Sequence, residues 1–313
     1  MTHTHLYELE RATPGVWGQE IVELRHNLHE SPLFSDDALA ALIERVPQQV
    51  SPVNTMAAKV HETTSWTYCD RSGLSGMEVL SAIKTGRLWI NLQKLEESDP
   101  SFKILLDTLY DELRAAIPGF NPYRTSIGVL ISSPDAQVFY HADVPGQSLM
   151  QVRGQKRIHI YPSREPYLKT PELENIIRGI TEEDITYDPA FDIDADSFEL
   201  TAGDFLHWPL NAPHRVENLG SLNVSVTLEH WTYETRRHFA MNYGNGILRR
   251  ELGITPRTRR IAGPAFWSKV ALTAAWRLAG LQKKQGFRRF AKCRVDPSAH
   301  NGVVPLQTAV DLS

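Results

Sequence analysis

Between residues 125 and 231 short runs of alternating apolar and polar residues are separated by turns, and this pattern limits the fold more than any other feature. Runs such as SIGVLI, KRIHIYP and LNVSVTLEHW are rich in β-branched and aromatic residues. Such alternation is typical of strands that bury one face. Several short strands joined by turns favour an antiparallel sandwich or barrel over a parallel α/β sheet. We therefore expect a mainly β fold in this part of the chain.

Helical patterns lie on both sides of the strand-rich region. Residues 35 to 46 begin with Ser35, a capping residue, followed by two acids and by apolar side chains at helical spacing. Similar patterns predict helices at residues 75 to 84, 102 to 117 and 264 to 281. The last of these carries apolar residues too densely for one narrow stripe, so we expect it to pack on more than one side. The tail from Asp296 onward is featureless and is expected to be docked or frayed.

Composition places the chain among ordinary globular proteins. It has 313 residues, of which 42% are hydrophobic and 22% charged, so neither a disordered nor a fibrous class is indicated. The longest apolar run, VALTAAWRLAGL, is interrupted by Arg277 and is too short for a membrane span. The first residues have no apolar core, so no signal peptide is expected. Two cysteines, Cys69 and Cys293, predict free thiols and a cytoplasmic location.

Charge is distributed unevenly along the chain. Residues 163 to 204 contain twelve acids and three bases, whereas residues 248 to 294 contain thirteen bases and the single acid Glu251. These two segments either contact each other or bind different partners. Part of the acidic segment, PELENIIRGITEEDI, has a helical pattern, and its position makes it a candidate lid or substrate-facing insertion.

Three residues form a candidate metal site. His141 and Asp143 are separated by one residue at a strand end, so both side chains can reach one point in space. His214 follows a distant strand and can complete the set. Two imidazoles and one carboxylate on one face of a metal suit Fe(II) with open coordination positions. A structural pocket without metal, or a zinc or manganese site, remains an alternative.

Lys156 is the second candidate site residue. In the strand KRIHIY, it shares one face with Ile158 and Ile160, while Arg157 lies on the other face. A lysine among inward isoleucines would be a costly buried cation unless it met an anion. In the alternative interpretation Lys156 faces solvent and Arg157 points inward.

Three motifs together resemble one known family. The H-x-D motif at His141, the segment QVRGQKRIHIYP, and GDFLHWP followed by His214 resemble the JmjC type of cupin-fold oxygenases that depend on 2-oxoglutarate and Fe(II). The chain is similar to the asparaginyl hydroxylase that modifies hypoxia-inducible factor. The resemblance covers about residues 125 to 231. It implies a double-stranded β-helix (a cupin-like jelly roll) at residues 61 to 235. A helical N-terminal cover would occupy residues 1 to 60, and a basic helical region that could mediate dimerisation would occupy residues 236 to 313.

The resemblance also implies an activity and a set of site residues. His141, Asp143 and His214 would ligate Fe(II), and Lys156 would bind the distal carboxylate of 2-oxoglutarate. The enzyme would hydroxylate a protein side chain or a small metabolite with O2 while 2-oxoglutarate is decarboxylated to succinate and CO2. Gln147 stands where the family has an amide side chain.

Two polar residues on the last strand are further candidates for cofactor binding. Asn223 and Ser225 alternate with apolar residues and could line a polar cavity, although a solvent-facing strand would explain them too. The chain also departs from the family pattern. Val138 stands where a hydroxyl residue often precedes the first ligand, and His207 and Trp208 replace the usual pair after Gly-Asp. These departures affect the expected cosubstrate pocket rather than metal binding.

A second function is compatible with the same pattern. The jelly roll could be a non-catalytic binding or regulatory scaffold whose basic tail contacts nucleic acid or an anionic partner. However, the basic residues are interleaved with large apolar ones such as Trp267 and Leu278, which favours packing. We therefore expect a homodimer formed through the C-terminal helices, and a protein or small-molecule substrate.

Overall fold

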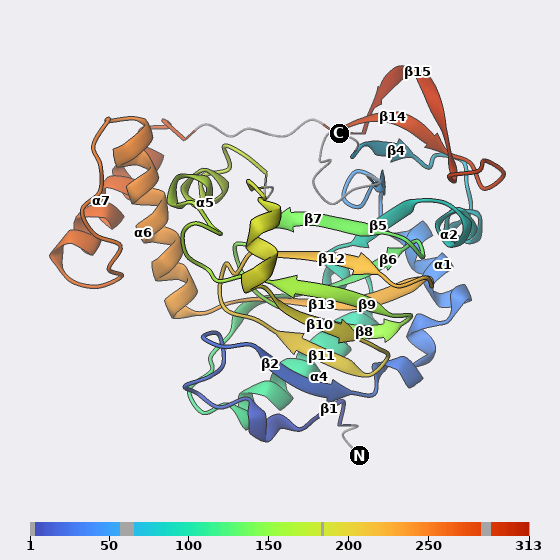
Figure 1. Cartoon of the computed structure of the whole chain (residues 1–313), viewed down its shortest axis with the longest axis horizontal. Helices are drawn as coiled ribbons and strands as arrows, with labels where there is room; N and C mark the ends of the chain where they lie inside the picture. Colours follow the sequence, from blue (N-terminus) through green and yellow to red (C-terminus); the bar gives the residue numbers. More distant parts are fainter. Residues whose placement is uncertain (1–3, 57–65, 183–184, 283–288, 313) are drawn as a thin grey trace.

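The computed structural model describes residues 4–56, 66–182, 185–282 and 289–312. Two β-sheets face each other: a four-stranded sheet lies against the middle of an eleven-stranded sheet (Figure 1). The smaller sheet has the strand order β10-β9-β12-β7, and the centre of the larger has the order β11-β8-β13-β6. All pairs within these eight strands are antiparallel.

Most consecutive strands of this central region alternate between the two sheets. The chain thus winds back and forth across the space between the sheets, which is the topology of a double-stranded β-helix, so the predicted jelly roll is confirmed. The strands are β6 (Tyr123–Ser132), β8 (Gly146–Arg153), β11 (Asp204–His207) and β13 (Asn223–Trp231) in the larger sheet, and β7 (Gln137–His141), β9 (Lys156–Ile160), β10 (Asp196–Leu200) and β12 (His214–Asn218) in the smaller.

The larger sheet extends beyond the jelly roll at both edges. N-terminal strands pair with β11, and a second group continues from β6 to the C-terminal hairpin. Both flanking regions therefore contain strands in addition to the predicted helices, and the tail beyond Asp296 forms most of a hairpin. The added strands are β1 (Leu6–Tyr7), β2 (Val22–His26), β3 (Val53–Thr55), β4 (Tyr68–Asp70), β5 (Leu88–Leu92), β14 (Phe290–Val295) and β15 (Val303–Asp311).

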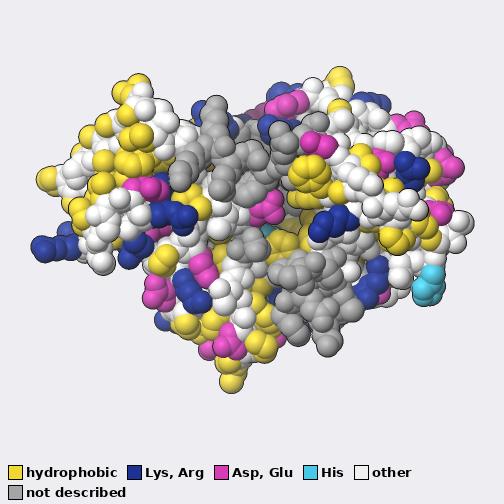
Figure 2. All heavy atoms as spheres, turned by 90° about the horizontal axis from the view of Figure 1, so that it is seen from above, with side chains coloured by type: hydrophobic (Ala, Val, Ile, Leu, Met, Phe, Trp, Pro, Cys, Tyr) yellow, Lys and Arg dark blue, Asp and Glu magenta, His cyan; other side chains and the backbone are white. Residues whose placement is uncertain are grey.

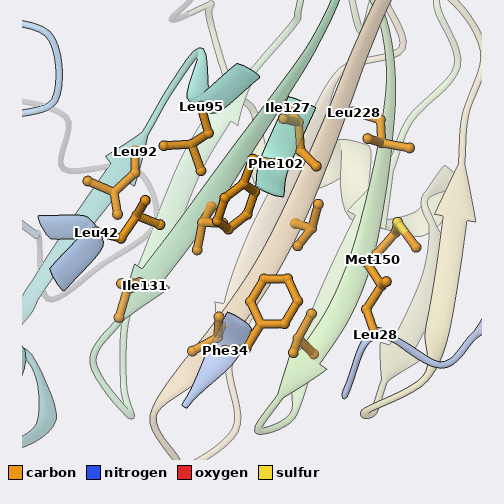
Figure 3. Close-up of a cluster of buried hydrophobic side chains, with 14 of the residues drawn as sticks. Leu28, Phe34, Leu42, Leu92, Leu95, Phe102, Ile127, Ile131, Met150 and Leu228 are labelled. Atoms are coloured by element: carbon orange, nitrogen blue, oxygen red, sulfur yellow. The ribbon is translucent and has the colours of Figure 1, made fainter. Parts of the chain in front are cut away.

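Helices cover the outer face of the larger sheet and form the main hydrophobic core with it (Figure 3). Ser35 caps a helix by accepting a hydrogen bond from the backbone, as predicted, and Ser75 caps another in the same way. Alternate apolar residues of β6 and β13, such as Ile127 and Leu228, pack against Phe102 of the longest covering helix. The helices on this side are α1 (Asp36–Arg45), α2 (Gly76–Thr85), α3 (Leu95–Ser98) and α4 (Pro100–Ala116). Short 3-10 helices span Leu9–Arg11, Leu28–Glu30 and Pro32–Phe34 in the N-terminal region, and Pro189–Asp194 immediately before β10 of the smaller sheet.

Three further helices form a lobe beside the jelly roll: α5 (Thr170–Ile177), α6 (Tyr233–Arg250) and α7 (Pro264–Leu278) (Figure 1). The acidic and basic segments of the sequence meet in this lobe. The buried carboxylate of Glu174 on α5 binds the guanidinium of Arg249 on α6 at 2.9 Å, and Arg178 binds Glu251 at 2.7 Å. Of the two explanations for the uneven charge, mutual contact is therefore observed.

The two cysteines form a disulfide, so the prediction of free thiols is wrong. Cys69 lies on β4 and Cys293 on β14, which pair in parallel with these two residues opposite each other. Sequence spacing could not reveal this pairing, because the cysteines are 224 residues apart and the hairpin was not predicted. The cysteines therefore no longer support the cytoplasmic location that was inferred from free thiols.

No helix in the described ranges is long and apolar enough to cross a membrane.

Candidate metal centre

The three predicted ligands converge at one end of the smaller sheet. His141 is the last residue of β7 and His214 the first of β12, and the two are direct cross-strand partners. Asp143 follows two residues after His141. Its carboxylate lies 4.0 Å from Nε2 of His141 and 3.4 Å from Nε2 of His214. One ligand atom from each residue lies within 4.8 Å of the others, so the three donors can reach a single ion.

Hydrogen bonds orient both imidazoles toward that point. Nδ1 of His141 donates to the carbonyl of Phe139 at 2.8 Å, and Nδ1 of His214 donates to the carbonyl of Ala212 at 3.1 Å. In the tautomer with the proton on Nδ1, Nε2 is the ring nitrogen free to bind a metal, and both Nε2 atoms face Asp143. Burial, with the neighbouring His141, holds the pKa of His214 well below its usual value, so this imidazole is neutral. Neutral imidazoles fixed by backbone carbonyls are the form in which histidine binds metals, so the residues fit a metal ion.

The ligand loops are tied together by residues that were not predicted to belong to the site. The side-chain amide of Asn211 donates to the carbonyl of Asp143 at 2.6 Å. The ring of Trp208 lies 4.8 Å from the ring of His214, and the ring of Phe139 lies 5.5 Å from that of His141. These contacts fix the loops on which the ligands stand. His207, by contrast, stacks on Trp17 on the other side of its strand and therefore packs away from the metal ligands.

The donor set limits the kind of metal. Two imidazoles and one carboxylate leave several coordination positions open, an arrangement suited to non-haem Fe(II) rather than to a closed structural zinc site. Within the described part of the chain, this is the one cluster of three such side chains arranged to hold a metal ion.

Lys156 points into the space between the two sheets, as predicted. It is 3% exposed and shares its face of β9 with Ile158 and Ile160, which belong to the interior cluster of the jelly roll. Burial lowers the pKa of Lys156 to about 7. No described acidic side chain lies within ion-pair distance of it. Arg157 points outward and pairs with Glu217 at 3.0 Å, so the alternative interpretation is wrong.

The polar residues predicted on the last strand also face the interior. Asn223 and Ser225 are 0% exposed, so a solvent-facing strand is excluded. Both bind Gln151 of β8, which was not predicted. The amide of Gln151 donates to the side-chain oxygen of Asn223 at 2.6 Å, and the hydroxyl of Ser225 donates to Gln151 at 2.7 Å. Gln151 could have been found because it alternates with apolar Met150 and Val152 on its strand.

The turn before Lys156 is built around one glycine. Gly154 has a φ of +77°, and a Cβ there would lie 2.3 Å from the carbonyl oxygen of Leu222. The amide of Asn223 donates to the carbonyl of Gln155 at 3.0 Å, immediately before Lys156. Asn223 therefore helps to fix the start of β9, the strand that carries the lysine.

Gln147 lies opposite Glu229 in the pairing of β8 with β13. Gln147 is buried beside Glu229 and lowers the pKa of its carboxyl group slightly. Burial, together with the nearby charge of Asp143, raises the pKa of Glu229 to about 7. Glu229 was not predicted as a site residue, although it continues the alternating series that contains Asn223 and Ser225.

A cavity of about 700 Å³ adjoins the metal-ligand loops. Asn211 and Trp208, which contact Asp143 and His214, form part of its wall, and residues of α6 such as Met241 form another part. The three ligands themselves do not line it. The cavity therefore lies beside the candidate metal centre, between the jelly roll and the helical lobe.

The fold is that of a cupin-like jelly roll, and comparisons with known proteins agree. A structure of Escherichia coli YcfD has a TM-score of 0.51 and 17% sequence identity, and the match covers 91% of this chain and 70% of that chain. A complex of the ribosomal oxygenase YcfD with cobalt and 2-oxoglutarate has a TM-score of 0.47 and 16% identity, with coverage of 86% and 65%. No protein-family model and no curated protein matches the sequence.

Proposed function

We propose that this protein is an Fe(II)- and 2-oxoglutarate-dependent oxygenase that hydroxylates a protein side chain or a small metabolite. The observation that carries the proposal is the combination of His141, Asp143 and His214, within reach of one ion, with a buried lysine in the same jelly roll. In the overall reaction, O2 supplies one atom to the new hydroxyl group and one to succinate, and CO2 leaves.

Each described residue has a role in this proposal. His141, Asp143 and His214 would hold Fe(II), which when bound supplies the centre at which 2-oxoglutarate and O2 react. The buried ammonium group of Lys156 requires an anionic partner, and the distal carboxylate of 2-oxoglutarate would be that partner. Apolar interior side chains, including Leu149 and Ile158, exclude water from the space between the sheets.

YcfD, whose fold this chain shares, supports the proposal. It is named a ribosomal oxygenase, and its structures include complexes with cobalt and 2-oxoglutarate. A hollow of about 700 Å³ beside the metal-ligand loops is large enough for several residues of a bound polypeptide, which favours a protein substrate. The finer similarity to an asparaginyl hydroxylase stays a prediction.

Succinate formation tests the function. The purified protein should convert 2-oxoglutarate to succinate only with Fe(II) and O2, slowly without substrate and faster when the substrate is present. His141→Ala and Asp143→Ala should abolish the conversion. Retention of both turnover and metal content in these two variants would refute the assignment.

We also propose that the protein forms a homodimer through α7. This helix buries Phe266, Lys269 and Thr273 among its fifteen residues. Trp267 is 56% exposed and Leu278 is 89% exposed, and with Ala271 and Ala274 they form a stripe at the spacing of a helix–helix interface. Hydrophobic side chains gather on this lobe, at the left of Figure 2. A second copy of α7 would cover the stripe.

A further inference from the structure

We propose that His230 and the aromatic side chains around it form a second ligand site, which binds a neutral phenol-like group: an aromatic ring that carries one hydroxyl. The site is the buried part of the cavity of about 700 Å³ beside the metal-ligand loops. His230 is separate from the candidate metal centre. The inference therefore goes beyond the proposed oxygenase function and does not depend on it.

His230 lies on the outer face of the larger sheet. Along β13 the side chains of Val226 and Leu228 pack into the main core on this face, and His230 continues their alternating series. Its ring centre lies 5.9 Å from that of Tyr110 on α4 and 5.1 Å from that of Phe120. The metal ligands, in contrast, lie on the smaller sheet and the loop that follows β7. His230 therefore belongs to the wall of the cavity and not to the metal centre.

The imidazole of His230 is buried without a hydrogen-bond partner. His230 is 4% exposed, and neither ring nitrogen has a partner among the residues that the structure describes. Neither nitrogen is fully enclosed, and the residue lines the cavity. The neighbouring His207 differs, because its Nε2 accepts from the backbone of Gly18 at 3.1 Å and its Nδ1 donates to the carbonyl of Gln147 at 2.7 Å. A ligand that hydrogen-bonds to His230 would remove the cost of leaving it unpaired.

A glycine makes room for the ring of His230. Gly146 is the cross-strand partner of His230 in the pairing of β8 with β13, and it also lines the cavity. A Cβ on Gly146 would lie 2.5 Å from Nε2 of His230. The φ of Gly146 is outside the left-handed region, so the backbone conformation does not require a glycine there. The glycine instead leaves the space in which the imidazole lies at the cavity wall.

The buried wall around His230 is made of rings. Trp17 stacks on His207 with ring centres 3.8 Å apart, and the ring of Phe120 lies 5.6 Å from that of Trp17. These three residues are at most 9% exposed, and all of them line the cavity. Ligand sites of this size are mostly apolar, with a few polar groups that orient the ligand. Aromatic walls with one unpaired imidazole therefore fit a flat ring that carries one polar group.

The polar group of the ligand follows from the charge of the cavity. Burial lowers the pKa of His230 to about 4, so the imidazole is neutral at pH 7 and offers one donor and one acceptor. A hydroxyl can donate and accept, and it can therefore bind either ring nitrogen. Of the described lining residues, Glu234 and Arg259 carry a charge, and both are exposed. An ionised group beside His230 would lack a counter-charge, whereas a phenol is neutral at pH 7.

Ligand-detected NMR titrations with matched probes test the inference. The whole chain, free of metal and at pH 7, is titrated with two pairs of probes that differ by one hydroxyl. The pairs are p-cresol with toluene, and Nα-acetyl-tyrosine amide with Nα-acetyl-phenylalanine amide. We expect the hydroxyl-bearing member of at least one pair to bind at least about fivefold more tightly than its partner. A preference for p-cresol alone identifies a small-molecule ligand, and a preference for the tyrosine derivative identifies a side chain of a polypeptide.

Two variants test whether the preference arises at His230. His230→Phe keeps a ring against Phe120 but removes both nitrogens, so it should abolish the preference. Gly146→Ala leaves His230 in the chain but places a methyl group against Nε2, and it should also reduce the preference. Circular dichroism establishes that each variant is folded. His29→Phe is the control, because His29 is exposed and is not among the residues that line the cavity, and this variant should keep the preference.

The inference is overturned if the wild type does not prefer the hydroxyl-bearing member of either pair, or if His230→Phe retains the preference. If His230→Phe does not fold, retention of the preference by Gly146→Ala overturns it instead. Loss of the preference in His29→Phe would place the binding elsewhere and would also overturn the inference. Because the titrations use metal-free protein, their result stands whether or not the oxygenase proposal holds.

Discussion

His141 and His214 are direct partners across β7 and β12, and each imidazole donates its Nδ1 proton to the backbone carbonyl two residues before it. The repetition of this hydrogen bond in both strands fixes the two rings in the same tautomer. Their Nε2 atoms are therefore aligned toward Asp143 before any metal binds. Such preorganisation lowers the cost of assembling the site.

Removal of either histidine should abolish tight metal binding. We expect His141→Ala and His214→Ala each to weaken Mn(II) binding by more than about a hundredfold, because only two of the three metal-binding side chains remain. Calorimetric titration with Mn(II) measures the effect. His159→Ala is the matched control, since His159 lies on the outer face of β9 and binds Ser197 and Glu217. A control variant that lost metal as completely as the ligand variants would place the site elsewhere.

Lys156→Met should stabilise the protein when no 2-oxo acid is bound. The substitution removes a buried ammonium group and should raise the free energy of unfolding at pH 7 by about 1–3 kcal/mol. The folded pKa of Lys156, about 7, lies below the ordinary value of 10.5. The unfolded chain therefore binds more protons between these values, and the stability of the wild type should approach that of the variant as the pH rises from 7 to 9.5.

Urea unfolding of both proteins across this pH range measures the difference. Lys156→Met should also weaken binding of 2-oxoglutarate to the Mn(II)-loaded protein by more than about tenfold. A stability difference that stayed constant with pH would show that Lys156 does not titrate in this range.

Reduction of the disulfide should destabilise the protein. Cys69 and Cys293 join strands that are 224 residues apart in sequence, so the bond restricts a long loop of the unfolded chain. We expect reductant to lower the free energy of unfolding by about 2–4 kcal/mol. A Cys69→Ser, Cys293→Ser double variant should match the reduced wild type and should not respond to reductant. Detection of two free thiols in unreduced, unfolded protein would contradict the pairing.

Leu278→Glu should convert the proposed dimer to a monomer without loss of fold, because Leu278 is 89% exposed in the single chain. Light scattering gives the mass of the wild type and of the variant. Ile193→Glu is a suitable control, since Ile193 is 88% exposed but lies on the 3-10 helix Pro189–Asp194 rather than on α7. A monomeric wild type, or a variant that remains dimeric, would rule out the α7 interface.

The jelly roll and the candidate metal-binding residues could be predicted because both follow from short patterns in the sequence. The period-two alternation grouped Lys156 with two isoleucines on one face of β9, and Asn223 with Ser225 on one face of β13, but left open whether these faces meet solvent. The structure buries all three residues. The capping residue Ser35 marked a helix start in the same way. These signals depend on near neighbours in the sequence.

Features made by distant segments were not predictable. The disulfide depends on the parallel pairing of β4 with β14. No local sequence pattern indicates which distant strands pair. Asn211 binds the carbonyl of Asp143 through a loop conformation with a positive φ, which the sequence does not specify. Glu229 was missed for another reason: its strand alternation was visible, but its place opposite Gln147 depends on the pairing of β13 with β8.

Binding of 2-oxoglutarate with and without metal tests the central claim most directly. That claim joins His141, Asp143 and His214 with Lys156 in one site. Calorimetric titration of 2-oxoglutarate into Mn(II)-loaded protein should show one site per chain, and removal of Mn(II) should weaken the affinity by at least about tenfold. Equal affinity with and without Mn(II), or no binding to the Mn(II)-loaded protein, would contradict the account.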